Sequence, residues 1–268
     1  MVGKIQVERK NKIALVTLNR PDKKNAFDES MFRSLESVTD ELRQNLPRAV
    51  IVTGAGDDAF CTGFDVNPEN PLVTQFLEVL NSKDLSLARK LVSRIRNAVD
   101  NFVSLPVPII AAINGLAYGG GMELATRCDL RVMDKRAFLC FSEVRLGLMP
   151  DWGGGVYLTR LVGTGVASDL ILTARRVNAG EALKIGLINR VSDQGQSVSD
   201  ATDLAEQISQ NGPRAVRHAL AVIRQSQGLP LENALELEAE TAAQLIVSGE
   251  CLQGVTAFME KKKPEFKD

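Results

Sequence analysis

Residues 114–125 read NGLAYGGGMELA, so that three consecutive glycines lead directly into a segment that favours a helix. They follow the apolar run PVPIIAAI at residues 106–113, whose composition is typical of a buried strand. Glycines allow backbone dihedrals that side chains forbid, and they let the main chain approach a ligand closely. The stretch therefore predicts a strand and a helix joined by a tight turn, with unpartnered amides where the helix starts.

The residues beside the glycines limit what this turn could bind. A P-loop is excluded, because Gly121 and Met122 stand where that motif has Lys and Ser or Thr. The dinucleotide motif G-x-G-x-x-G is also absent at this strand end. The amides and the dipole of a helix start suit an oxyanion that forms on a carbonyl, where one donor contributes roughly 3–4 kcal/mol. A purely structural turn is the alternative.

Two glutamates and a second glycine segment could complete such a site. Glu123 follows Gly120 by three residues, which places it on the first helical turn beside the predicted oxyanion site. Glu143 lies among apolar residues in FSEV, as expected for a glutamate in a lined pocket. The alternatives are that Glu123 only complements the helix dipole and that Glu143 lies in a surface turn. A second amide donor is available from Phe64, which follows Gly63 in AFCTGFDV.

The composition leaves proton chemistry to carboxylates. The 268 residues include one histidine, His218, which lies among arginines in a helix-like segment, and no G-x-S-x-G motif. The formal charge of −1 argues against binding to nucleic acid or to an anionic membrane. No apolar run approaches the roughly 20 residues of a membrane span. The four scattered cysteines form no metal-binding pattern and indicate reduced thiols in a cytoplasmic protein.

The order of the predicted elements indicates an α/β fold with a helical C-terminal region. A hairpin is predicted at residues 5–18, and buried strands at residues 48–54 and 106–113 alternate with helical segments. Towards the C-terminus the pattern is helical only, and it ends in the basic tail EKKKPEFKD. We therefore predict an α/β core over residues 1–200 and an α-helical region over residues 201–268.

Six segments resemble the enoyl-CoA hydratase/isomerase family, also called the crotonase superfamily. The resemblance covers nearly the whole chain, and its most specific block is PVPIIAAINGLAYGGGMELATRCDLRV. The other five segments are VTLNRPDKKNAF, AFCTGFDV, FSEVRLGLMPDWGGGVYLTRLVG, TARRVNAGEALKIGLINRV and GVTAFMEKKKPEF. Because all six occur in the family's order and at the expected separations, chance similarity is improbable.

This resemblance implies a crotonase-like spiral of ββα turns with a C-terminal helical region that assembles homotrimers or dimers of trimers. Members bind acyl-CoA thioesters and stabilise the thioester enolate with two backbone amides, which correspond here to Phe64 and Gly120. In the hydratases two glutamates flank the bound thioester, here Glu123 and Glu143. We expect Glu123 to activate water and Glu143 to protonate the α carbon. No metal is expected, and no cofactor besides the CoA of the substrate.

The resemblance also implies where the CoA moiety binds. Lys23, Lys24 and Ala26 are expected along its arm, Lys263 at its phosphates, and Phe266 of a neighbouring subunit's tail at its adenine. The lysines before Pro264 could alternatively be a solvated surface. The other residues expected to contact the substrate are Gly63, Asp65, Gly119 and Trp152.

Three departures from the family pattern leave the acyl group open. Phe64 stands where hydratases carry a small residue, Ser142 replaces a frequent proline, and Asp151 with Trp152 replaces small residues beside the acyl pocket. Asp151 is a candidate third acid, or else it caps the helix that follows Pro150. Trp152 is expected to line the pocket, with core packing as the alternative.

Three functional hypotheses follow from these residues. The leading one is a hydro-lyase that adds water to, or removes it from, the 2,3 double bond of an enoyl-CoA. The second is a Δ3-Δ2-enoyl-CoA isomerase that uses Glu143 or Asp151 as a proton shuttle. The third is a non-catalytic relative that binds acyl-CoA or RNA, against which the glutamate pair and the near-neutral charge argue.

Overall fold

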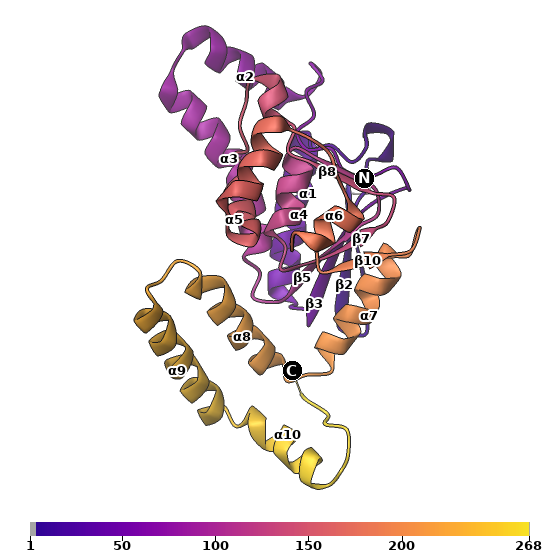
Figure 1. Cartoon of the computed structure of the whole chain (residues 1–268), viewed down its shortest axis with the longest axis vertical. Helices are drawn as coiled ribbons and strands as arrows, with labels where there is room; N and C mark the ends of the chain where they lie inside the picture. Colours follow the sequence, from indigo (N-terminus) through magenta and orange to yellow (C-terminus); the bar gives the residue numbers. More distant parts are fainter. Residues whose placement is uncertain (1–3, 268) are drawn as a thin grey trace.

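A computed structural model describes residues 4–267 and contains two sheets with helices packed around them (Figure 1). The larger sheet has the order β1-β2-β3-β5-β7-β10, and the smaller has the order β4-β6-β8-β9. The strands of the larger sheet are β1 (Ile5–Lys10), β2 (Ile13–Leu18), β3 (Ala49–Gly54), β5 (Ile109–Ile113), β7 (Leu130–Asp134) and β10 (Arg190–Ser192). Those of the smaller sheet are β4 (Ala59–Cys61), β6 (Leu116–Tyr118), β8 (Phe138–Cys140) and β9 (Val177–Asn178).

Strand pairing in the larger sheet follows the hydrophobic pattern of the sequence. β1 and β2 form the predicted antiparallel hairpin, and β2, β3, β5, β7 and β10 pair in parallel. Every residue of β3 and of β5 is buried. Continuous apolar strands of this kind are typical of a parallel sheet that is covered on both faces.

The chain alternates between the two sheets in a repeated order. In the larger sheet β3 is followed by β4 of the smaller sheet, β5 by β6, and β7 by β8, and each of these pairs is followed by one or more helices. These helices are α2 (Pro71–Ser82) and α3 (Leu85–Val103) after β4, α4 (Gly120–Arg127) after β6, and η2 (Glu143–Leu146) with α5 (Gly154–Thr173) after β8. This is the expected ββα spiral. The hydrophobic pattern of the sequence did not indicate β4 or β6, because three residues are too few to display the alternation of apolar and polar residues that is typical of a strand.

Helices cover both faces of the larger sheet. α1 (Glu29–Gln44) begins after Asp28, whose side chain caps the helix by accepting the N–H of Met31 at 2.9 Å. α7 (Ser197–Ser209) packs its buried Ala201 and Ala205 into a second apolar cluster on the other face. The remaining short elements of this part are η1 (Pro21–Lys23) and α6 (Ala179–Lys184).

The last three helices form an arm that extends from the sheets (Figure 1). This C-terminal arm comprises α8 (Pro213–Ser226), α9 (Leu231–Val247), α10 (Glu250–Met259) and the tail up to residue 267. α9 buries none of its residues, and Val247 and Phe258 are 87% and 84% exposed. α7 crosses residue 200 and packs on the sheet, so the division between residues 1–200 and 201–268 stays a prediction.

Candidate active site

The glycine turn is packed closely on two sides. Gly119 has a φ of +50°, in the left-handed region that favours glycine. A Cβ on Gly120 would lie 2.6 Å from the Trp152 ring, and a Cβ on Gly121 would lie 2.1 Å from the carbonyl oxygen of Cys61. The glycines therefore let the start of α4 approach β4 and Trp152. The turn is tight, as predicted, and its structural role leaves the amide of Gly120 available.

The segments that carry the Phe64 and Gly120 amides meet beside this turn. Phe27 donates to the carbonyl of Gly63 at 2.7 Å and accepts from the amide of Asp65 at 2.9 Å. In such a parallel bridge the intervening Phe64 directs its own N–H to the opposite side. A Cβ on Gly63 would lie 2.6 Å from the nitrogen of Gly120, so the two segments are in contact. Neither amide donates to a main-chain carbonyl of a turn or loop within residues 4–267, and a helix offers no acceptor to its first N–H.

Glu123 is fully buried, and both of its carboxylate oxygens accept main-chain hydrogen bonds. Oε1 accepts the N–H of Asp151 at 3.1 Å, and Oε2 accepts the N–H of Gly154 at 2.8 Å. Burial, together with the charge of Glu143, raises the pKa of Glu123 to about 8, although the hydrogen bond from Gly154 opposes the increase. Glu123 therefore differs from a surface glutamate that only complements a helix dipole.

Glu143 lies on the other side of the turn, at the start of η2. Its Oε1 would lie 3.5 Å from a Cβ on Gly119, and its side chain is largely buried. Within residues 4–267 neither carboxylate oxygen of Glu143 has a hydrogen-bond partner. Burial raises the pKa of this carboxyl, its own main-chain N–H and the neighbouring Glu123 carboxyl oppose the increase, and the charge of Asp151 adds to it. Its position excludes the alternative of a solvated surface turn.

Asp151 and Trp152 precede α5. The structural alternatives for them were helix capping by Asp151 and core packing by Trp152, and the structure has only the second. The N-cap of α5 is Gly153, which makes no side-chain capping bond, so the interpretation of Asp151 as a helix cap is wrong. The sequence misled here because the chain makes an additional turn before the helix begins. Asp151 is exposed, but desolvation still raises the pKa of its carboxyl.

Trp152 is 3% exposed and packs in the aromatic core. Its ring centroid lies 5.5 Å from that of Phe27 and 5.3 Å from that of Phe32. Because the same ring also contacts Gly120, Trp152 forms the wall behind the glycine turn. Its predicted contact with an acyl group stays a prediction.

The loop expected to bind CoA lies alongside the segment that contains Phe64. Lys23 and Lys24 are exposed, and the carbonyl of Lys24 accepts the N–H of Thr62 at 3.2 Å. Arg20 Nη1 donates to the carbonyl of Ala26 at 3.1 Å. The structure thus places Lys23, Lys24 and Ala26 next to the segment that carries the Phe64 amide.

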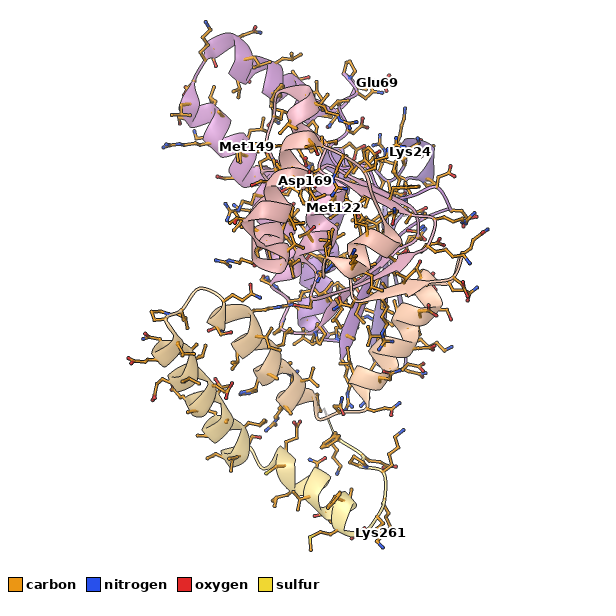
Figure 2. The ribbon with its side chains drawn as sticks, viewed as in Figure 1. Lys24, Glu69, Met122, Met149, Asp169 and Lys261 are labelled. Atoms are coloured by element: carbon orange, nitrogen blue, oxygen red, sulfur yellow. The ribbon has the colours of Figure 1, made fainter. Side chains whose placement is uncertain are left out.

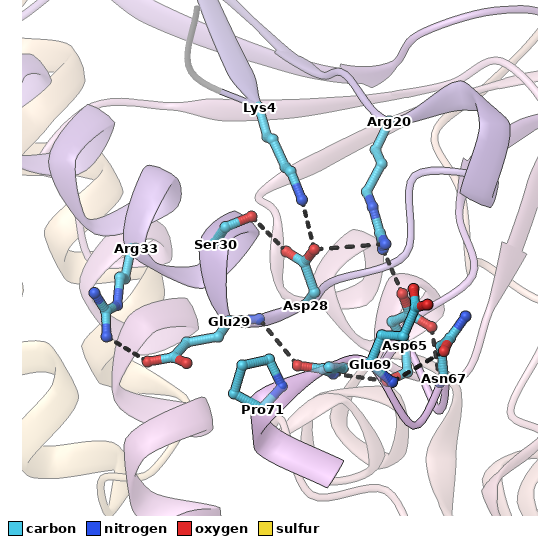
Figure 3. Close-up of a pocket in the computed structure, with 11 residues that line it drawn as sticks. Lys4, Arg20, Asp28, Glu29, Ser30, Arg33, Asp65, Asn67, Glu69 and Pro71 are labelled. Atoms are coloured by element: carbon cyan, nitrogen blue, oxygen red, sulfur yellow. Dashed lines mark hydrogen bonds and ion pairs between the residues drawn. The ribbon is translucent and has the colours of Figure 1, made fainter. Parts of the chain in front are cut away.

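Asp65 anchors this arrangement through Arg20 (Figure 3). The Oδ2 atom of Asp65 accepts from Arg20 Nη1 at 2.6 Å, and Arg20 also lies 3.5 Å from Asp28. The polar pocket around these groups has a volume of about 450 Å³ and is lined by neither Glu123 nor Glu143. Asp65 therefore has a clear structural partner, and its predicted contact with substrate stays a prediction.

Lys263 and Phe266 lie far from the glycine turn of their own chain. The carbonyl of Phe266 accepts from Arg48 Nη2 at 2.7 Å. Arg48 lies immediately before the first residue of β3, whereas the segment that carries Phe64 follows the other end of this strand. Figure 2 shows Lys24 on the core and Lys261 at the far tip of the C-terminal arm. Within one chain the tail does not reach the loop at Lys23, so its predicted role requires the tail of a neighbouring subunit.

No arrangement among the described residues suggests a resident metal. No group of three His, Cys, Asp or Glu side chains within residues 4–267 could hold a metal ion. The four cysteines are unpaired, and three of them are buried. Among the helices of residues 4–267, none has the length and apolar character needed to cross a membrane.

Two arginines of this region were not singled out from the sequence. Arg20 joins the loop expected to bind CoA to Asp65, and Arg127 donates to the carbonyl of Trp152 at 2.7 Å. Both lie inside segments that carry the family resemblance, but nothing in the local pattern separates them from ordinary surface arginines. Their partners are distant in the sequence.

Comparison with known proteins identifies the family. A family model described as enoyl-CoA hydratase/isomerase matches residues 8–268. The protein YngF of Bacillus subtilis strain 168, whose name places it among the enoyl-CoA hydratases/isomerases, is 40% identical over 95% of this chain and 94% of its own. A short-chain-enoyl-CoA hydratase of Clostridium acetobutylicum is 34% identical over 98% of this chain and 97% of its own.

The fold leads to the same family. The crystal structure of an enoyl-CoA hydratase from Bacillus anthracis matches with a TM-score of 0.88 and 34% identity, covering 98% of this chain and 99% of the other. An enoyl-CoA hydratase structure from Geobacillus kaustophilus matches with a TM-score of 0.87 and 30% identity, covering 98% of each chain. The chain therefore belongs to the enoyl-CoA hydratase/isomerase family, the crotonase superfamily.

Proposed function

We propose that the protein is a hydratase that adds water to the 2,3 double bond of an enoyl-CoA thioester. The observation that carries this proposal is the pair of buried glutamates on either side of the glycine turn, of which one accepts two amide hydrogen bonds and the other none. Relatives named short-chain-enoyl-CoA hydratase and crotonyl-CoA hydratase, from Clostridium acetobutylicum and Syntrophomonas wolfei, support the same reaction class. The reverse dehydration uses the same groups.

The Phe64 and Gly120 amides are the proposed oxyanion hole. The thioester carbonyl would accept both N–H groups, and negative charge grows on its oxygen as water adds to the β carbon. Both donors belong to the main chain, so the bulky side chain of Phe64 does not remove either of them. The adjoining loop with Lys23, Lys24 and Ala26 would hold the CoA arm.

The surroundings of the two glutamates favour different proton roles. Glu123 is the better base, because its two amide hydrogen bonds satisfy the ionised carboxylate. Glu143 is the better acid, because its buried oxygens have no such donors when it is ionised. In hydration Glu123 takes a proton from water, the hydroxyl bonds to the β carbon, and the double-bond electrons form the enolate. Glu143 then gives its proton to the α carbon. Transfer of the proton from Glu123 to Glu143 restores the starting state.

Substitution of each glutamate tests this assignment. We expect Glu123→Gln and Glu143→Gln each to lower kcat for hydration of crotonyl-CoA by about 10²- to 10⁴-fold, the usual contribution of a positioned acid or base. Dissociation constants for CoA thioesters should change little, as measured by calorimetry. Glu8→Gln, on an exposed part of β1, is the matched control. Near-normal hydration by Glu143→Gln would rule out the two-carboxylate mechanism.

A Δ3-Δ2 isomerase is the second candidate, and Asp151 is the observation that favours it. Its charge raises the pKa of both Glu123 and Glu143, and its main-chain N–H donates to Glu123 Oε1 at 3.1 Å, so Asp151 lies beside the pair. The test is conversion of a 3-enoyl-CoA to the 2-enoyl isomer without uptake of labelled water oxygen. Loss of that conversion in Asp151→Asn would support Asp151 as the shuttle, and its retention would assign the shuttle to Glu143.

We further propose that the protein acts as a homotrimer or a dimer of trimers. The exposed apolar residues of the C-terminal arm support this assembly, as does the distance between the tail and the glycine turn of one chain. Lys263 and Phe266 would then contact the CoA bound to a neighbouring subunit. The substrate's own CoA is the only cofactor that this mechanism needs, and a cytoplasmic location stays the expectation.

A further inference from the structure

The two amides that bind Glu123 belong to one short loop, residues 151–154, and α4 holds this loop in a second way. The carbonyl of Trp152, between those amides, accepts from Arg127 Nη1 at 2.7 Å. Arg127 follows Glu123 by one helical turn, so both side chains project from the same face of α4. Glu123 thus accepts from the loop while Arg127 donates to it.

Arg127 is itself held in place by three other groups. Its Nη1 lies 2.6 Å from Asp100 Oδ1, on α3, and its guanidinium lies 5.1 Å from the centre of the Tyr157 ring, on α5. A Cβ on Gly153 would lie 3.2 Å from Nη1, so the loop backbone packs directly on the guanidinium. The side chain of Arg127 is only 7% exposed. A charged hydrogen bond at such a buried site is stronger than one at the surface.

We propose that Arg127 is a positioning residue for the Glu123 carboxylate, acting through the Trp152 carbonyl. By fixing residues 151–154, Arg127 keeps both amides in the geometry that orients the carboxylate towards water. The inference depends on the proposed hydratase function for its kinetic consequence. Its structural basis is independent of that function, because the hydrogen bonds connect protein groups only.

Loss of Arg127 would act on Glu123 in two ways. The loop could move, and a displacement of 1 Å at a catalytic group can cost about 10²-fold in rate. The amide hydrogen bonds stabilise the ionised carboxylate, so their weakening makes Glu123 keep its proton to higher pH. Substrate binding at the Phe64 and Gly120 amides would be affected much less.

The experiment compares Arg127→Met with Arg127→Lys. Methionine retains an aliphatic chain of similar length without donors, whereas lysine can still donate to the Trp152 carbonyl and pair with Asp100. With crotonyl-CoA we expect Arg127→Met to lower kcat about 10- to 100-fold, with KM within about threefold. The acidic limb of its kcat/KM profile should move upward in pH, and Arg127→Lys should recover at least part of both losses.

Arg96→Met is the matched control. Arg96 also pairs with Asp100, at 3.3 Å, but it is 58% exposed and makes no hydrogen bond or ion pair with residues 151–154. It should retain wild-type kcat and pH profile. Equal losses in Arg96→Met and Arg127→Met, or an unshifted acidic limb in Arg127→Met, would overturn the proposal. Should Arg127→Met fail to fold, Arg127→Lys and Asp100→Asn carry the same comparison in a milder form.

A readout without turnover separates this inference from the proposed function. Infrared titration can follow the carboxyl band of Glu123, assigned by its absence in Glu123→Gln. The titration midpoint should be higher in Arg127→Met than in the wild-type protein. An unchanged midpoint would overturn the role of Arg127, whereas a wild-type protein inactive on enoyl-CoA substrates would overturn the proposed function and leave this result standing.

Discussion

Glu123 and Glu143 are the same residue type, yet the protein surrounds them differently. Glu123 accepts two amide hydrogen bonds, whereas the oxygens of Glu143 accept none within residues 4–267. Burial raises the pKa of both carboxyls. Interacting acids of this kind lose their protons in two steps that belong to the pair. The proposed division into base and acid therefore depends on hydrogen bonding and not on residue type.

This pairing predicts a bell-shaped dependence of kcat/KM on pH. At low pH both carboxyls are protonated and no base is available, and at high pH both are ionised and no acid is available. Burial and the charge of its neighbour raise the pKa at Glu123 to about 8, which in so closely coupled a pair belongs to the second proton that the pair loses, so we expect the alkaline limb near pH 8. Initial rates of crotonyl-CoA hydration between pH 5 and 10 measure the profile. Activity that stays constant from pH 7 to 10 would contradict a pair sharing one proton.

The same pKa values predict how stability depends on pH. Folding raises the pKa of Glu123 from 4.5 to about 8, so its contribution to stability is lost progressively as pH rises through this range. Glu143→Gln removes one of the two buried charges. Between pH 6 and 9 this variant should lose less free energy of unfolding than the wild type, by on the order of 1–3 kcal/mol. Urea unfolding at fixed protein concentration measures the difference, and parallel curves for the two proteins would contradict it.

At the scale of elements, α4 connects most parts of the site. Its first amide is a proposed oxyanion donor, its first turn carries Glu123, and its last turn carries Arg127. The helix has only eight residues, so its position must come from neighbouring elements rather than from helix propensity. Close packing of the glycine turn on β4 supplies that position.

Two glycine substitutions test this dependence on packing. A Cβ on Gly121 would lie 2.1 Å from the backbone oxygen of Cys61, so Gly121→Ala should lower the free energy of unfolding by about 3 kcal/mol or more. Gly165, in α5, has nothing within 4 Å of its Cβ position. Gly165→Ala should therefore be neutral or stabilising by up to about 1 kcal/mol. Thermal and urea unfolding measure both, and a stable Gly121→Ala protein would show that α4 can move away from β4.

At the scale of the whole molecule, the C-terminal arm leaves much apolar surface uncovered. α9 buries none of its residues, and α10 buries only Glu250 and Ala257. Large exposed apolar areas in a soluble domain usually mark an interface. The proposed trimer would cover this surface and bring the tail of one subunit towards the CoA loop of another.

Charged substitutions in the arm test the proposed assembly. Val247→Asp and Phe258→Asp place a carboxylate at residues that are 87% and 84% exposed in the single chain. Light scattering should give the wild-type protein three or six times the chain mass of 29.1 kDa and the variants a lower mass. Lys10→Asp, exposed in the core hairpin, should leave the mass unchanged. A monomeric wild-type protein at micromolar concentration would contradict the assembly.

The sequence by itself determined the elements whose signals are local. The hairpin at residues 5–18 and the buried strands β3 and β5 all follow from hydrophobic period and turn residues. Glu123 and Glu143 could also be singled out, the first because it follows the glycine turn and the second because it is a carboxylate among apolar residues. The family resemblance added the ββα order, which the three-residue strands β4 and β6 could not reveal by their own patterns.

Only the tertiary structure decided how these residues are surrounded. It shows that Asp151 gives its amide to Glu123 and does not cap α5, that Trp152 packs behind Gly120, and that residues 151–154 are held by Arg127. The physical reason is that a local pattern reports the burial and dihedrals of neighbouring residues. Hydrogen bonds, pKa values and close contacts depend instead on groups that the fold brings together from distant parts of the chain.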